Sequence, residues 1–196
     1  MGRSDTDDEV QQFQPTSGRV TGVLALLLAA VIAVLGLVEG GLPGVVVAGA
    51  ALGGVLAWAA MLRPALWVTR SDLVMRNMVE TTSIPLAAIE GLAVRQVLAV
   101  SAGDRRYVSP VVGRPLRKLV RPLKEPAAGK AAETPYADYV EDVLRQRVDA
   151  ARSAAGVRRG SPEQLALAAG VRREPAWLPI VLITGGVVAF VVTLVA

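Results

Sequence analysis

The chain has 196 residues, of which 53% are hydrophobic and 19% charged, and its mean hydropathy of +0.46 is too apolar for an ordinary soluble domain. It contains no Cys and no His, which excludes disulfides, thiolate nucleophiles, Cys/His metal sites and histidine-dependent catalytic triads. The formal net charge is +4, and we expect no metal, no cofactor and no enzymatic activity from the residue types that remain.

In chain order, three stretches lack any charged residue: 20–38, 40–62 and 176–196. Each is close to the about 20 residues that a helix needs to cross a bilayer. The sequence therefore predicts three transmembrane helices. The first two form a hairpin over 20–62, with spans at about 20–38 and 43–62, and the third covers 176–196.

Lys and Arg flank the spans unevenly, because the loop between the first two spans carries none. By the positive-inside rule this loop lies outside, the amino terminus and residues 63–175 are cytoplasmic, and the carboxyl terminus is outside. The Ala-, Gly-, Val- and Arg-rich composition indicates a multi-pass protein of the bacterial plasma membrane. Residues 1–19, which are acidic, are expected to form a disordered cytoplasmic leader.

The second predicted span carries two glycines four residues apart, Gly49 and Gly53. Small residues at this spacing let two helix backbones approach closely. We expect this strip to pack against the first span. Contact between copies of the chain, in an oligomer, and chance spacing in an Ala/Gly-rich helix stay open as alternatives.

Five short apolar runs rich in β-branched residues follow the second span, and turn-like residues separate them. They predict antiparallel strands joined by hairpins, at 65–70, 73–77, 79–84, 91–98 and 106–112.

An amphipathic helix is predicted after the strands, from Thr134 and Pro135 to Gly156. Tyr136 and Tyr139 follow the helical spacing of its apolar residues, and we expect them in the core. The opposite face carries three acidic residues, Asp138, Glu141 and Asp142. We expect them to face solvent rather than to form a metal or acid/base site, and we expect Glu141 to pair with Arg145 four residues on.

Residues 158–175 are predicted to be a short helical linker to the third span. Within them, Ser161 and Gln164 match a capping box at the start of a short helix that ends at Gly170.

Hairpins closed by one helix favour an α+β domain over residues 63–157, either a small β-barrel or a sandwich with a helical plug, since an open sheet would leave edges and an apolar face uncovered. The sequence patterns of three segments are also informative: residues 66–77, residues 82–92 with Ile84-Pro85, and residues 136–141. Together they resemble the bacterial pleckstrin-homology-like (PH-like) domains of actinobacterial membrane proteins. Where that family often has Trp, this chain has Leu86. The resemblance covers about 90 of the 196 residues and implies a PH-like β-barrel capped by a carboxy-terminal helix, with a binding or scaffolding role.

A basic excess between residues 63 and 124 is the sharpest chemical feature, with eleven Lys and Arg against four acids. It could face anionic lipid headgroups of the inner leaflet, or it could simply set the membrane topology. We expect no nucleic-acid partner, because Tyr107 is the only aromatic residue among the basic residues of 105–124 and no binding motif is present. The candidate lipid- or partner-binding residues are Arg105, Arg106, Arg114, Arg117, Lys118, Arg121 and Lys124.

Three functional hypotheses follow. The leading one is a non-enzymatic integral membrane protein whose cytoplasmic PH-like domain binds a partner protein or organises a membrane complex. The second is a sensor of anionic inner-leaflet lipid that acts through the basic segment. The third is a membrane-bound enzyme, for which the sequence offers no constellation of catalytic residues.

Overall fold

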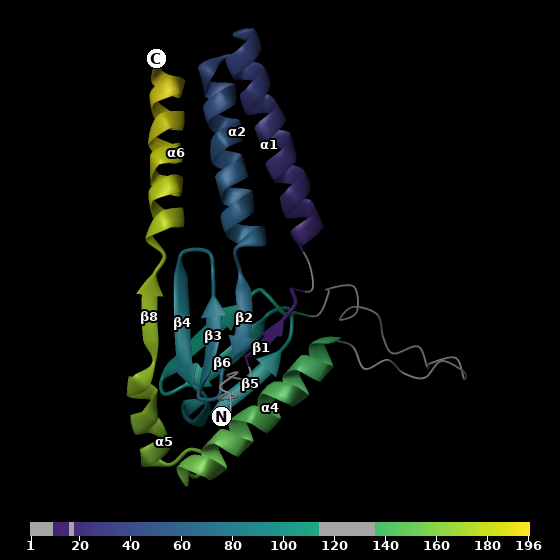
Figure 1. The fold of residues 1–196 in the computed structure, drawn as a ribbon. Helices are drawn as coiled ribbons and strands as arrows, with labels where there is room; N and C mark the ends of the chain where they lie inside the picture. Colours follow the sequence, from purple (N-terminus) through teal and green to yellow (C-terminus); the bar gives the residue numbers. More distant parts are fainter. Residues whose placement is uncertain (1–9, 16–17, 114–135) are drawn as a thin grey trace, which may run out of the picture. The chain divides into compact units, whose positions relative to one another are not determined.

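The computed structural model describes residues 10–15, 18–113 and 136–196 (Figure 1). Their contacts divide the chain into two compact units. The helical unit draws its described residues from Ser17–Pro64, Arg76–Thr81 and Glu174–Ala196. The α+β unit draws its described residues from Met1–Thr16, Ala65–Met75 and Thr82–Arg173.

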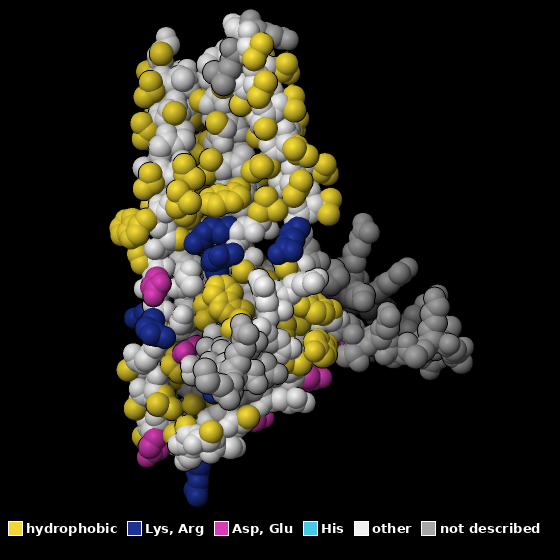
Figure 2. All heavy atoms as spheres, in the orientation of Figure 1, with side chains coloured by type: hydrophobic (Ala, Val, Ile, Leu, Met, Phe, Trp, Pro, Cys, Tyr) yellow, Lys and Arg dark blue, Asp and Glu magenta, His cyan; other side chains and the backbone are white. Residues whose placement is uncertain are grey.

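Three long apolar helices build the helical unit, and this confirms the three predicted spans. Each contains 18 or 19 residues that are apolar enough to cross a membrane. Their backbone polar groups bond within the helix, as a lipid environment requires, and hydrophobic side chains cover their surfaces (Figure 2). The helices are α1 (Arg19–Glu39), α2 (Gly44–Ala57), which continues into the π-helical turn η1 (Trp58–Leu62), and α6 (Trp177–Val195).

Within this unit α2 packs against both α1 and α6. Glycines make the close approaches: a methyl group added to Gly54 would lie only 2.9 Å from Cβ of Ala29 on α1. One added to Gly36 of α1 would overlap the side chain of Val47 on α2. The contacts therefore depend on the absence of side chains at these points.

The first sheet has five strands in the order β1-β2-β3-β4-β8. β1 pairs antiparallel with β2, with Phe13 opposite Leu66. The prediction of a disordered leader over 1–19 is therefore wrong for residues 11–13, because the apolar side chain of Phe13 is buried in the core. The strands are β1 (Gln11–Phe13), β2 (Ala65–Val68), β3 (Asp72–Arg76), β4 (Glu80–Pro85) and β8 (Arg172–Pro175).

The second sheet has three antiparallel strands in the order β5-β6-β7. They are β5 (Gly91–Val94), β6 (Leu98–Ala102) and β7 (Arg105–Ser109). The run predicted as one strand over 91–98 is divided, because the chain reverses between Val94 and Leu98, which lie opposite each other.

Helical segments accompany the sheets. The predicted amphipathic helix is confirmed as α4 (Tyr136–Ala155), and Ser161 caps α5 (Pro162–Leu167) by accepting a hydrogen bond from Gln164 N–H at 3.3 Å. The linker prediction is wrong at its end, where residues 172–175 form β8 instead of a helix. Two 3-10 turns complete the set, η2 (Leu86–Ala88) and η3 (Ala168–Gly170).

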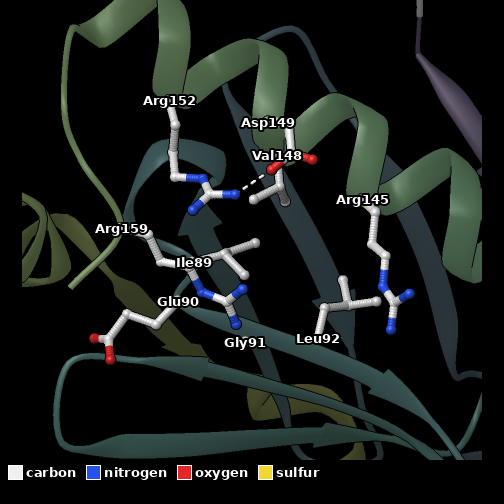
Figure 3. Close-up of a pocket in the computed structure, with 9 residues that line it drawn as sticks. All are labelled: Ile89, Glu90, Gly91, Leu92, Arg145, Val148, Asp149, Arg152 and Arg159. Atoms are coloured by element: carbon white, nitrogen blue, oxygen red, sulfur yellow. Dashed lines mark hydrogen bonds and ion pairs between the residues drawn. The ribbon is translucent and has the colours of Figure 1, made fainter.

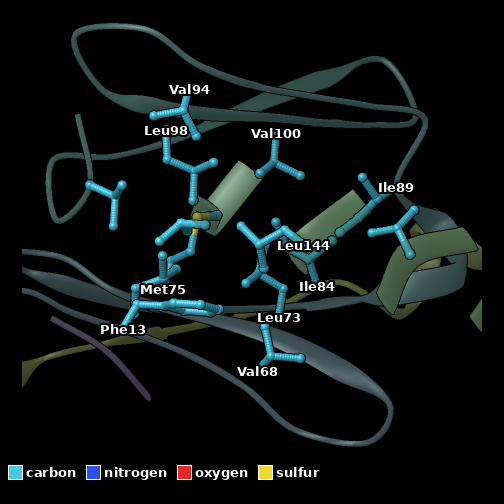
Figure 4. Packing of buried hydrophobic residues seen from close by; sticks show 14 of the residues in the cluster. Phe13, Val68, Leu73, Met75, Ile84, Ile89, Val94, Leu98, Val100 and Leu144 are labelled. Atoms are coloured by element: carbon cyan, nitrogen blue, oxygen red, sulfur yellow. The ribbon is translucent and has the colours of Figure 1, made fainter. Parts of the chain in front are cut away.

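One hydrophobic core joins both sheets and α4 (Figure 4). Leu73 and Met75 of β3 and Leu98 of β6 enter it, and Leu144 of α4 is fully buried among them. The expectation that Tyr136 and Tyr139 belong to this core is wrong. They are 40% and 50% exposed, because the buried face of α4 consists of Ala137, Val140, Leu144 and Val148.

The α+β class is confirmed, whereas the two sheets stay separate over the described residues and neither closes into a barrel. α4 packs against β5 and η2, and α5 packs against η2. The fully buried amide of Gln164 fastens α5 in place: Nε2 donates to the carbonyls of Ala87 and Ile89 at 3.1 and 3.0 Å, and Oε1 accepts from Gly160 N–H at 2.7 Å.

Candidate functional sites

The predicted basic residues fall into two groups. Arg105 and Arg106 begin β7, opposite Ala102 and Ser101 of β6, and both are exposed. Because side chains alternate along a strand, these two point to opposite faces of the sheet. The other five lie outside the described residues: Arg114, Arg117, Lys118, Arg121 and Lys124.

Arg105 lines an open hollow of about 450 Å³ between the β6–β7 turn and the α5–η3 segment, which we call the β7–η3 hollow. The turn is tight, since Gly103 has φ +58° and its N–H donates to Oε1 of Glu90 at 2.7 Å. Arg106 does not line this space. The wall combines cations, an aromatic ring and apolar side chains: Arg105, Tyr107, Leu165, Ala168, Val171 and Arg173, with Asp104 at the turn.

A second cavity, of about 360 Å³, lies between β5 and α4, and we call it the α4–β5 pocket (Figure 3). Its floor is apolar and comes from Ile89, Leu92 and Val148. Three arginines stand around it, Arg145 and Arg152 from α4 and Arg159 from the segment after the helix. The remaining lining residues are Glu90, Gly91 and Asp149.

The charges around this pocket are only partly paired. Arg145 forms the ion pair with Glu141 that the sequence predicts, at 2.5 Å, and Glu141 also accepts a hydrogen bond from Val94 N–H of β5 at 3.3 Å. Arg152 pairs with Asp149. The carboxylate of Glu90 points away from the arginines (Figure 3) and accepts the hydrogen bond from Gly103 N–H.

Sequence reasoning missed the α4–β5 pocket. It placed Arg145 on the solvent face of a helix and assigned neither Arg152 nor Arg159 to a site. The sequence contained a usable signal, because Arg145 and Arg152 are seven residues apart. Residues at this spacing occupy nearly the same helix face two turns along. Arg159 continues that spacing, but it lies beyond Gly156, where the helix has ended and only the tertiary fold decides the direction of the side chain.

The turn between β3 and β4 is tied to two membrane helices. Arg63, directly after η1, donates from its guanidinium to the carbonyls of Asn77 and Met78, and Arg76 Nε donates to the carbonyl of Arg63 at 3.0 Å. Ala176, directly before α6, donates its N–H to the carbonyl of Val79 at 2.8 Å. Burial, and then the charge of Arg76, lower the pKa of Arg63. These contacts give the two arginines a structural role at the span ends.

The glycine strip packs differently from the prediction. Gly49 faces Phe190 of α6, with 3.2 Å between an added methyl group and the ring, and an added methyl group on Gly53 meets nothing within 4 Å. The expectation that this strip packs against the first span is wrong, because the helix face that meets α1 is one residue further on, at Gly54.

In the described ranges, no three acidic side chains come close enough together to hold a metal ion. No protein-family model, no curated protein and no solved structure matches the chain. The functional argument therefore depends on the geometry of the described residues.

Proposed function

We propose that this chain is a non-enzymatic integral membrane protein whose α+β unit is a PH-like domain that binds a partner protein. The order of elements supports the PH-like assignment: the strands β2 to β4, the strands β5 to β7 and then α4 share one core. This is the arrangement that the resemblance implies, with α4 as the capping helix.

The proposed topology places the amino terminus and the α+β unit on the cytoplasmic side of a bacterial plasma membrane. The asymmetry of charge at the span ends supports it. Arg19 begins α1 and Arg63 follows η1, whereas the short connection between α1 and α2 has no Lys or Arg.

The β7–η3 hollow is the observation that carries the partner-binding proposal. Arg and Tyr are the residue types that protein interfaces favour, and here Arg105 and Tyr107 stand beside Leu165, which is 45% exposed. An exposed leucine leaves apolar surface in contact with water, and a partner that covers the side chain would remove this surface from water.

A photo-crosslinking amino acid at position 165 tests this proposal in full-length protein within the membrane of cells that produce it. The matched control is position 167, since Leu167 is also on α5 and 36% exposed but does not line the hollow. We expect one discrete protein adduct from position 165 and none from 167. Arg105→Ala should reduce that adduct several-fold, whereas Arg106→Ala should leave it unchanged. Equal adducts from both positions, or only lipid adducts, would refute the proposal.

Anionic lipid binding through the basic segment is the second candidate, and the exposure of Arg105 and Arg106 favours it. Native mass spectrometry of the full-length protein tests it through the anionic lipid that stays bound after mild detergent extraction. Lipid binding predicts that the Arg105→Ala/Arg106→Ala variant loses most of this lipid and that high salt does the same to the unaltered protein. Equal retention by both proteins at all salt concentrations would eliminate this candidate.

A further inference from the structure

The α4–β5 pocket has the size and chemistry of a small-ligand site. Its volume of about 360 Å³ lies within the range of about 300–1,000 Å³ typical of such sites. The floor of Ile89, Leu92 and Val148 is apolar, and the polar groups around it belong to Arg145, Arg152 and Arg159 (Figure 3). An apolar floor with a few convergent charged groups is the usual design of a pocket that orients one polar end of a ligand.

The described charges of the pocket leave a positive surplus. Three guanidinium groups line it against the carboxylates of Glu90 and Asp149. Glu90 is engaged by Gly103 N–H and turned away. Glu141 offsets the charge of Arg145 and Asp149 that of Arg152, so the positive charge of Arg159 is left over. Cations held near one another in a partly desolvated space repel, and a bound anion removes that repulsion.

One hydrogen-bond donor of the pocket has no acceptor. Nε of Arg152 is buried and has no hydrogen-bond partner in the described residues, although the guanidinium is fixed by Asp149. A buried donor without an acceptor costs free energy, about 1–3 kcal/mol when nothing else satisfies it. Because Nε itself is closed off from solvent, a ligand in the pocket would instead meet the terminal guanidinium nitrogen that Asp149 does not hold.

Arg159 supplies a second cation, one that no described carboxylate neutralises, and the residue is exposed. Its side chain extends over Gly91 into the pocket (Figure 3), and within the described parts of the chain it forms no hydrogen bond or ion pair. Arg152 and Arg159 thus direct two planar guanidinium groups at the same space. Such groups match the oxygens of phosphate in a two-pronged geometry.

We propose that the α4–β5 pocket binds a phosphate monoester group, with Arg152 and Arg159 as its direct ligands and Arg145 as a nearby positive charge. A phosphate is favoured over a single carboxylate, because it offers three terminal oxygens as acceptors to the two planar guanidinium groups. This assignment goes beyond the proposed function, since it concerns different residues from those of the β7–η3 hollow and names a ligand class.

The test uses the full-length protein in nanodiscs of phosphatidylcholine, titrated with glycerol 3-phosphate and followed by 31P NMR. We expect saturable binding, about tenfold weaker in Arg159→Gln because one charge-assisted contact is lost. Arg158→Gln is the matched control, since Arg158 is an adjacent exposed arginine that does not line the pocket. We expect it to keep the affinity within twofold. Both variants should unfold at the same temperature as the unaltered protein without ligand.

Arg152→Lys separates geometry from charge. It keeps the positive charge but loses the planar fork, so we expect weaker binding of glycerol 3-phosphate even in a folded protein. Because Arg152 also pairs with Asp149, the unfolding temperature of the Arg152→Lys variant is measured alongside its affinity. If this variant does not fold, the comparison of Arg159→Gln with Arg158→Gln decides the proposal.

Two further arms define the ligand. Acetate at the same concentrations should not displace glycerol 3-phosphate. The second arm repeats the titration in nanodiscs that contain phosphatidic acid. If the pocket takes a lipid headgroup, the apparent Kd for glycerol 3-phosphate rises, and if it takes a soluble molecule, this Kd stays unchanged. The proposal is overturned by absence of saturable binding, by equal losses in Arg158→Gln and Arg159→Gln, or by equally strong acetate binding.

Discussion

The two units of this protein use the same aliphatic residues in opposite ways. In the helical unit only 6%, 11% and 6% of the residues in the three spanning windows are buried, and leucines such as Leu28 remain 62% exposed. In the α+β unit Leu66, Leu98 and Leu144 are 0% exposed. The difference teaches that composition alone does not locate a core, because lipid can replace protein as the apolar surrounding.

Packing inside the two units follows from this difference. The helices approach through positions without side chains, at Gly36 and Gly54, since aliphatic side chains gain little by leaving lipid for protein. The α+β unit instead fills its interior with large side chains, and it satisfies Gln164, the one long polar side chain that is completely buried among its described residues. The predictions below test this contrast.

Leu144→Ala should have the largest effect. The side chain is fully buried between α4 and both sheets, so its loss leaves a cavity and costs about 2–5 kcal/mol. Hydrogen–deuterium exchange of the amides of α4 in the full-length protein measures this loss. The control is Leu28→Ala on α1, where lipid refills the space and we expect little change in the exchange of α1. Similar effects at both positions would remove the contrast between the units.

Gln164→Leu should rank second. The substitution leaves the carbonyls of Ala87 and Ile89 and the N–H of Gly160 without the amide, and we expect the α+β unit to lose about 2–3 kcal/mol. Urea unfolding of the full-length protein in nanodiscs measures it. Gln146→Leu makes the same chemical change at an exposed position of α4 and should alter stability by less than about 0.5 kcal/mol. A neutral Gln164→Leu would mean that water satisfies these groups.

Sequence reasoning succeeded where the signal is local and long. The three spans follow from charge-free stretches, and α4 follows from the spacing of Val140, Leu144 and Val148. Ser161 also appears as a cap, because capping involves residues only three apart. Each of these elements has its physical cause within its own segment.

The same reasoning failed where a distant segment decides the structure. β1 and β8 have three and four residues and exist because they pair with β2 and β4, far away in the chain. Tyr136 fits the apolar rhythm of α4, yet its hydroxyl accepts a hydrogen bond from Gln14 N–H at 2.8 Å and the ring stays partly exposed. The α4–β5 pocket is of the same kind, since its third arginine lies outside the helix.

Gly54→Ala should have a smaller effect, within the helical unit. Its methyl group would lie 2.9 Å from Cβ of Ala29, which has no flexible end to move away, and such overpacking costs about 1–3 kcal/mol. Unfolding of the full-length protein by titration with sodium dodecyl sulfate measures the loss. Gly53→Ala is the adjacent control with open space around it, and it should be neutral or gain up to about 1 kcal/mol in helix propensity. The reverse ranking would show that α1 and α2 do not pack through Gly54.

The smallest expected effect concerns pH and Glu163, at the start of α5. Its own backbone N–H and then the hydroxyl of Ser161 hydrogen-bond the carboxylate and lower the pKa of Glu163. Because folding favours the charged form, this contribution is complete above the ordinary pKa of a glutamate and is lost as the pH falls through the lowered folded value. Thermal unfolding of the full-length protein from about pH 6 to pH 3 measures it. We expect Glu163→Gln to be slightly less stable than the unaltered protein at the upper end of this range and equally stable at the lower end. A constant difference across the range would show that the carboxylate charge does not stabilise α5, and the cap at Ser161 would then act through Gln164 N–H alone.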